Sequence, residues 1–193
     1  MQHQLNHSEF KERQSKRKNN IIFILENLEH MENIGSCFRL ADAFFIDKII
    51  IVSNKIEFNK KLKKTARNCE KTVDFFVVDD IARALDYIKK EGYMPFNLEI
   101  TSTSVPLRNV DFSTYNKVAL IVGNEKKGIE EKTLNLVKDS VHIDMYGNNS
   151  SMNVITALSI ATYKISEDFL SKKWENWKCA INKYFKGTKK FVN

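Results

Sequence analysis

The chain has 193 residues, of which 42% are hydrophobic and 28% are charged, so it is long enough to bury a core and is not typical of a disordered chain. Its 31 lysine and arginine residues outnumber its 24 acidic residues, and the resulting net charge of +7 favours a polyanionic partner. No apolar run approaches the roughly 20 residues that cross a bilayer, which excludes a transmembrane protein.

Three cysteines and four histidines are scattered along the chain, without the paired spacing of a disulfide framework or a zinc site. We therefore expect reduced thiols, no bound metal and a cytoplasmic location. The N-terminal stretch MQHQLNHSEFKERQSKRKNN has no apolar core and no small-residue cleavage site, so it does not resemble a secretory signal.

The hydrophobic pattern predicts a single domain over residues 1–193, with basic extensions at about 1–20 and about 171–193. Strands are predicted, in chain order, at Ile21–Leu25, Lys48–Val52, Asp74–Val78, Phe96–Thr101, Val118–Val122 and Val141–Ile143. Helices are predicted at Ile34–Phe44, Asp80–Glu91, Ile129–Lys138 and Met152–Leu170. The runs KIIIV and VALIV are apolar throughout, as in parallel strands that are covered on both faces. The sequence thus predicts an α/β fold with a mostly parallel sheet and helices on both faces.

Ligands of such sheets bind beyond the carboxyl ends of the strands, and three polar loops follow predicted strands. In the first loop, Asn33 occupies the place of a helix N-cap, and Arg39 points away from the buried stripe of the next helix. Each also has an ordinary structural interpretation, because helix caps and solvated arginines are common.

The second loop follows VALIV and contains Gly123, Asn124, Glu125 and Gly128. Glycine permits backbone conformations and close approaches that a side chain would block. Three of the six glycines, including Gly147, fall in this loop and the third one. We therefore expect a ligand to contact this backbone.

The third loop reads DMYGNNSSMN and leads without a break into an apolar helix. Ser150, Ser151 and Asn153 can bond the free N–H groups of that helix, but capping explains one polar residue rather than seven in a row. The chain has no P-loop, Rossmann glycine motif or G-x-S-x-G elbow, so the sites of those enzyme classes are not supported.

Three segments carry a resemblance to a known family: NIGSCFRLADAFFIDKIIIV, LIVGNEKKGI and IDMYGNNSSMNVITALSIATYKI. They resemble the three ordered motifs of the SpoU branch of the SPOUT methyltransferases, which are RNA ribose 2′-O-methyltransferases. The resemblance covers about residues 21–163. The chain departs from the family pattern at Phe45 (usually Gly), Asp144 (usually Pro), Met152 (usually Leu) and Ile155 (often Ser).

The resemblance implies a SPOUT-type fold with a C-terminal trefoil knot, S-adenosylmethionine as cofactor, and a homodimer with the active site at the subunit interface. It places the cofactor against the strand ends and loops, at Thr101, Gly123, Asn124, Gly128, Ile143, Met145 and Met152. It also makes Arg39 catalytic and adds Asn33, Glu125, Ser151 and Asn153 as further catalytic site residues.

A guanidinium with a pKa above about 12 is an implausible base. We therefore interpret Arg39 as a residue that grips a substrate phosphate and stabilises the developing alkoxide. We expect Asn33 and Glu125 to orient Arg39 and the second loop. Ser151 and Asn153 are expected to hold the substrate or to shape the cofactor loop.

RNA contacts are expected from basic residues near the N-terminus and between the second and third strands, namely Arg13, Lys16, Arg17, Lys18, Lys63, Lys64 and Arg67. The basic segment ahead of the first strand favours transfer RNA methylated at a D-loop guanosine. The alternatives are ribosomal RNA or the wobble ribose of transfer RNA. A further alternative, of another class, is a non-catalytic RNA-binding protein on the same fold.

Overall fold

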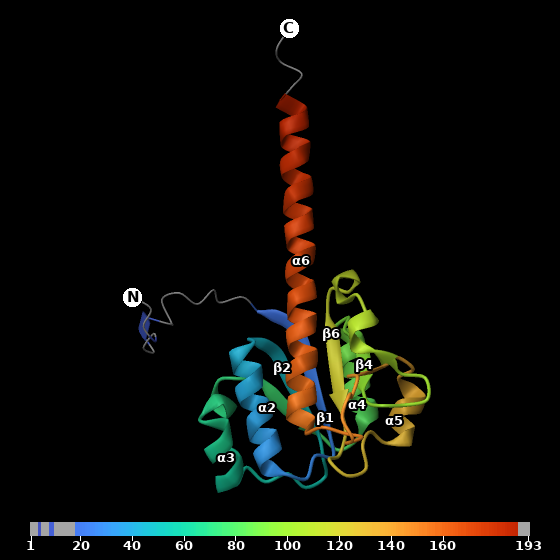
Figure 1. Cartoon of the computed structure of the whole chain (residues 1–193). Coiled ribbons are helices and arrows are strands. Elements are labelled where there is room, and N and C mark those ends of the chain that lie inside the picture. The colour runs from blue at the N-terminus through green and yellow to red at the C-terminus, as the bar shows by residue number, and fades with distance from the viewer. Residues whose placement is uncertain (1–3, 5–7, 10–17, 189–193) are drawn as a thin grey trace.

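The computed structural model describes residues 4, 8–9 and 18–188, with side chains up to residue 172 within the last helix. Figure 1 shows a body built on one sheet and a long C-terminal helix that projects from it. Within the described residues, no helix combines the length and apolar character needed to cross a membrane.

The sheet has seven strands, which are β1 (Asn19–Glu26), β2 (Ile46–Val52), β3 (Phe75–Val78), β4 (Met94–Leu98), β5 (Val105–Pro106), β6 (Val118–Val122) and β7 (Ser140–His142). Their spatial order is β3-β2-β1-β6-β4-β7-β5, and all six neighbouring pairs are parallel. The predicted mostly parallel sheet is confirmed.

The helices of the structure are α2 (Met31–Ala43), α3 (Lys60–Ala66), α4 (Ile81–Lys90), α5 (Glu131–Leu136) and α6 (Val154–Thr188). Short 3₁₀ turns lie at Cys69–Lys71, Leu107–Asn109 and Phe112–Thr114. The strand predicted at Phe96–Thr101 ends at Leu98, and neither α3 nor β5 was predicted. The trefoil knot stays a prediction.

Both faces of the sheet are covered, because alternate residues of the central strands enter two separate apolar clusters. Phe23 of β1 packs in the cluster formed with α2, α3 and α6. Its neighbour Ile24 packs in the cluster formed with α4 and α5. The central strand β6 is buried along its whole length, which explains its continuous apolar sequence.

The first face depends on a close approach between α2 and α3. A Cβ on Gly35 would overlap Thr65 Oγ1 and would lie 2.5 Å from the carbonyl oxygen of Leu62. Only glycine allows these two helices to pack at this distance. This contact fixes α2, and with it the connection from β1 that enters the site.

Candidate active site

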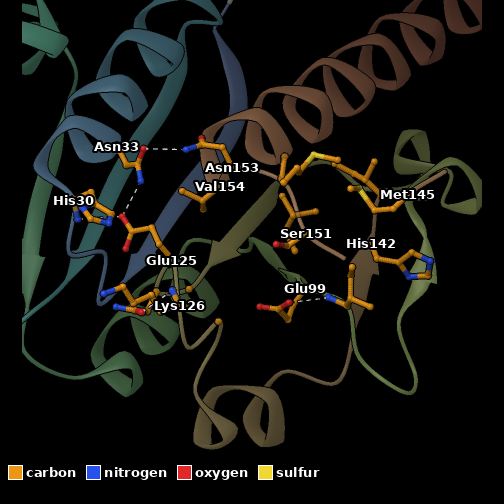
Figure 2. Close-up of a pocket in the computed structure, with 18 residues that line it drawn as sticks. His30, Asn33, Glu99, Glu125, Lys126, His142, Met145, Ser151, Asn153 and Val154 are labelled. Carbon is orange, nitrogen blue, oxygen red and sulfur yellow. Dashed lines mark hydrogen bonds between the residues drawn. The ribbon is translucent and has the colours of Figure 1, made fainter. Parts of the chain in front are cut away.

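A cavity of about 570 Å³ opens at the carboxyl edge of the sheet (Figure 2). Its walls come from four parts of the chain, at 30–33, 98–100, 123–128 and 142–157. These segments follow β1, β4, β6 and β7, so the parallel topology brings them to one edge. The cavity is therefore formed by the three loops that the sequence had singled out, together with residues 98–100 at the end of β4.

The loop after β6 folds tightly back on itself. Asn124 and Gly128 exchange two backbone hydrogen bonds of 3.0 and 2.8 Å, and Gly128 has a φ of +69°. A Cβ on Gly123 would overlap the Gly128 carbonyl, so both glycines are required by the backbone itself. The Asn124 carboxamide oxygen accepts bonds from the N–H groups of Lys126 and Lys127, at 2.9 and 3.1 Å.

Glu125 projects from this loop toward the start of α2. Its carboxylate accepts hydrogen bonds from Glu29 N (3.0 Å), His30 N (3.1 Å) and Asn33 Nδ2 (2.8 Å). Partial burial acts to raise the pKa of Glu125, but these donors outweigh it and hold the pKa below its ordinary value. Glu125 is therefore a fixed carboxylate that stays charged at neutral pH.

Asn33 is not an N-cap, and that interpretation of the sequence was wrong. The helix begins at Met31, with His30 in the cap position, because the Glu125 carboxylate accepts the free N–H groups there. The Asn33 side chain is left to bridge two loops: it donates to Glu125 and accepts from Asn153 Nδ2 at 3.4 Å (Figure 2).

Asn153 caps α6, as the sequence predicted. Its side-chain oxygen accepts the N–H of Ile155 at 2.8 Å, and its carbonyl accepts the N–H of Ala157 at 3.0 Å. Ser151, two residues earlier in the loop before α6, lines the same cavity. Asn33, Glu125, Ser151 and Asn153 thus lie together, although up to 120 residues separate them in the chain.

The lining of the cavity also includes the apolar residues Leu98, Ile143, Met145, Met152 and Ala157. Of the seven residues expected to contact a cofactor, six line the cavity. Thr101 does not, because β4 ends early and Ile100 takes its place. Thr101 instead forms a turn in which its N–H donates to Ser104 Oγ at 2.9 Å.

Five ionisable residues of this region were missed from the sequence. His30, Glu99, Lys126 and His142 line the cavity, and Glu26 is buried at the end of β1 with 1% of its surface exposed. Glu26 accepts hydrogen bonds from Glu130 N at 3.0 Å and from Thr133 Oγ1, and so anchors the far end of the loop. Burial raises the pKa of Glu26, against the effect of these donors. For Glu26 the available signal was its position directly after the predicted strand Ile21–Leu25.

Arg39 is exposed on α2 and does not line the cavity. It lies six positions after Asn33, which is about 240° around the helix axis. Among the described residues of this single chain, neither Asn33 nor Glu125 bonds to Arg39, so the expectation that this pair orients Arg39 stays a prediction. The structure therefore separates Arg39 from the other four residues.

The described residues among those expected to contact RNA do not line the cavity. Lys63, Lys64 and Arg67 are exposed along α3 and at its C-terminal end. Lys18 forms an ion pair with Asp47. Arg13, Lys16 and Arg17 lie outside the described residues. No group of three or more potential metal ligands occurs in the described part of the chain.

The structure shows the surroundings of two residues that depart from the family pattern, Asp144 and Phe45. Asp144, near the cavity, forms an ion pair with Arg108, so its charge is compensated. Phe45 follows the C-terminal end of α2 with a φ of +47°, a conformation that glycine adopts readily and a bulky residue does not.

Comparisons with known proteins agree with this arrangement. The model of the SpoU rRNA Methylase family matches residues 20–163. The 23S rRNA (guanosine-2′-O-)-methyltransferase RlmB of Blochmanniella floridana is 29% identical over 167 residues, which make up 83% of this chain and 63% of that protein.

Two solved structures share the fold. The TrmH/SpoU tRNA modifying enzyme of A. aeolicus has a TM-score of 0.72 at 24% identity, over 82% of this chain and 79% of that one. The SpoU methyltransferase AviRb of Streptomyces viridochromogenes, in complex with AdoMet, has a TM-score of 0.72 at 20% identity, over 81% of this chain and 60% of that one. The chain spans 57–63% of the length of the three RlmB relatives that it matches.

Proposed function

The chain belongs to the SpoU rRNA Methylase family, and from this premise we propose that it is an S-adenosylmethionine-dependent RNA ribose 2′-O-methyltransferase. The observation that carries the proposal is the hydrogen-bonded group of Asn33, Glu125 and Asn153. This group lines a cavity whose other lining residues include Gly123, Gly128 and several apolar side chains. This group pairs polar side chains from all three motifs in one place. A protein that had kept only the fold would not need it.

The cavity fits the proposed cofactor in size and chemistry. Its volume of about 570 Å³ lies within the usual range for small-molecule sites, roughly 300–1,000 Å³. The apolar side chains of Ile143, Met145 and Met152 in its lining suit an adenine ring. Gly123 and Gly128 allow the tight loop that brings backbone groups to the cavity. S-adenosylmethionine, when bound, supplies an electrophilic methyl group.

The chain's own residues would then position the ribose and its proton. A ribose hydroxyl is a weak nucleophile and needs activation. Glu125 and Asn33 are held in fixed orientations by their mutual bond, and both residues line the cavity. Arg39 has the two-pronged geometry that binds a phosphate and stabilises a developing alkoxide.

We propose that Arg39 acts on the cavity of a second subunit. Its exposure and its distance around α2 from Asn33 support this assignment, because it does not reach the cavity of its own chain. The side of α6 with exposed Ile160, Tyr163 and Leu170 is suited to an interface between two copies. The expected homodimer is thus part of the proposal.

For the substrate, we propose transfer RNA methylated at a D-loop guanosine. The names of the relatives indicate two classes of RNA substrate, since one relative acts on a guanosine of 23S ribosomal RNA and another is a transfer RNA modifying enzyme. The basic residues ahead of the first strand, among them Lys18, support transfer RNA as the substrate. Free thiols at Cys37 and Cys69 suit a reducing compartment such as the cytoplasm.

The test is to incubate the purified protein with unmodified transfer RNA transcripts and methyl-labelled S-adenosylmethionine, and to map the label by nuclease digestion and mass spectrometry. We expect 2′-O-methylguanosine in the D-loop. Label at the wobble ribose or in ribosomal RNA would support the proposed reaction and contradict the proposed substrate. If no RNA is labelled and the labelled cofactor does not bind, the proposed activity is wrong.

A further inference from the structure

Glu99 lies at the end of β4 with its carboxylate in the cavity, and no motif of the sequence accounts for it. Its Oε1 accepts the N–H of Ile100 at 2.9 Å, and its Oε2 accepts the N–H of Ile129 at 3.3 Å. Among the described residues, no lysine, arginine or histidine forms an ion pair with it. A carboxylate accepts about four hydrogen bonds, so Glu99 has acceptor capacity left for a ligand.

The position of Glu99 in the cavity is central. Figure 2 shows Glu99 and Ser151 between Asn33 and Glu125 on one side and Met145 and His142 on the other. A nucleoside with its base against the apolar wall and its reactive end near Glu125 would place its sugar in between. Glu99 is therefore beside the expected sugar rather than beside the base or the methyl group.

Gly128 packs directly against one oxygen of Glu99. A Cβ on Gly128 would lie 2.5 Å from Glu99 Oε2, so only glycine leaves space for the carboxylate at this point. Together with the bond from the Ile129 N–H, this contact fixes the Glu99 side chain in the lining of the cavity. An acidic side chain at a strand end is a well-established acceptor for ribose hydroxyls in other α/β proteins.

Resting on the proposed function, we infer that Glu99 recognises the ribose of the cofactor, by accepting hydrogen bonds from its vicinal 2′- and 3′-hydroxyls. Glu99 then has two roles: one lone pair on each oxygen fixes the loop through Ile100 and Ile129, and the others bind the sugar. It is a recognition residue and takes no part in methyl transfer.

The test compares the binding of S-adenosylhomocysteine with that of its 2′-deoxy and 3′-deoxy analogues, by titration calorimetry. S-adenosylhomocysteine lacks the sulfonium charge, so simple attraction to a carboxylate does not contribute. We expect the unaltered protein to bind at least one deoxy analogue about tenfold or more weakly, because a site built for a hydroxyl rejects a ligand without it.

Glu99→Gln keeps the shape of the side chain and changes its acceptors. We expect this change to weaken the binding of S-adenosylhomocysteine. We also expect it to reduce the difference in affinity between S-adenosylhomocysteine and the deoxy analogues to about threefold or less. Glu57→Gln makes the same chemical change at an exposed position outside the cavity and should leave all the affinities unchanged.

If Glu99 has only a structural role, Glu99→Gln will weaken the binding of all three ligands by the same factor. This result would overturn the inference and leave the proposed function intact. If the unaltered protein binds S-adenosylhomocysteine but does not discriminate among the three ligands, the inference also fails. Absence of any binding up to about 1 mM would reject the proposed cofactor and the role of Glu99 together.

Discussion

Asn33 and Glu125, which lie 92 residues apart in the chain, are joined by a hydrogen bond of 2.8 Å that closes the cavity at its polar end. The bond connects the start of α2 with the loop after β6. Because Glu125 also accepts two backbone N–H groups, this carboxylate organises both segments at once. Its ionisation is therefore coupled to the shape of the site.

Glu125→Gln should lower the free energy of unfolding by about 1 kcal/mol at neutral pH, since charged hydrogen bonds are lost. The pKa of Glu125 is lower in the folded state than the ordinary value of 4.5. The contribution is thus fully present above pH 4.5 and is lost as the pH falls through the lowered pKa. Urea unfolding of the unaltered protein and of Glu125→Gln between pH 3 and 7 measures this contribution, with the exposed Glu131→Gln as control. If the difference in free energy of unfolding grew on acidification, the prediction would be contradicted.

Arg39→Ala should reduce methyl transfer at least tenfold, which is about 1.4 kcal/mol of transition-state stabilisation. Arg39→Lys should be almost as inactive, because an ammonium cannot bind a phosphate through two parallel bonds. Since Arg39 is exposed, neither change should alter the melting temperature. Mixing Arg39→Ala with Glu125→Gln should restore part of the activity, because mixed dimers contain one intact site. Full activity of Arg39→Ala alone would remove Arg39 from the mechanism.

Replacing both Lys63 and Lys64 with alanine should weaken RNA binding across sequences and lower the slope of log affinity against log salt by about 1.5. The same double change at Lys89 and Lys90, which are exposed on α4 on the other face of the sheet, is the matched control. Filter binding at several salt concentrations gives both slopes. Equal slopes for the two variants would show that α3 does not contact the phosphates.

Phe45→Gly should stabilise the protein by about 1 kcal/mol, because it removes the strain of a bulky residue with φ at +47°. Little packing is lost, since 46% of the Phe45 surface is exposed. Phe45→Ala separates the two effects, because it shortens the side chain and keeps the strain. We expect alanine to give no gain in urea unfolding, and an equal gain from both changes would mean that φ is not the cause.

Gly35→Ala should destabilise the protein by about 1–3 kcal/mol, because its methyl group would overlap Thr65 Oγ1 and crowd the Leu62 carbonyl. Adding Thr65→Ala should recover part of the loss and not all of it, since the carbonyl remains. Thermal unfolding of the three variants checks this order. A Gly35→Ala protein as stable as the original would show that α2 and α3 are not packed this closely.

The parts of the fold that the sequence predicted well are those with local signals. β6 was placed at its observed bounds because five apolar residues lie between polar ones. The helix α3 was missed because only Leu62 and Ala66 of its seven residues are buried, too few for a helical period. Glu99 was hidden inside the predicted strand Phe96–Thr101.

The site was predictable as a set of residues and not as a set of contacts. The motifs indicated Asn33, Glu125 and Asn153, but the role of each was decided by partners far away in the chain. Asn33 was taken for a helix cap since no local feature revealed that the carboxylate of Glu125 would fill that place. Non-local hydrogen bonds of this kind leave no periodic trace in a sequence.

The bond between Asn153 and Asn33 spans 120 residues, and this separation governs when the cavity can form. Contacts between distant residues must overcome the entropy of closing a long loop, so they form late in folding. A nascent chain that has emerged only as far as β6 lacks the whole wall from residues 142–157. The proposed cofactor site is therefore incomplete until residues 142–157 have emerged and folded, and binding of the proposed cofactor would report that step.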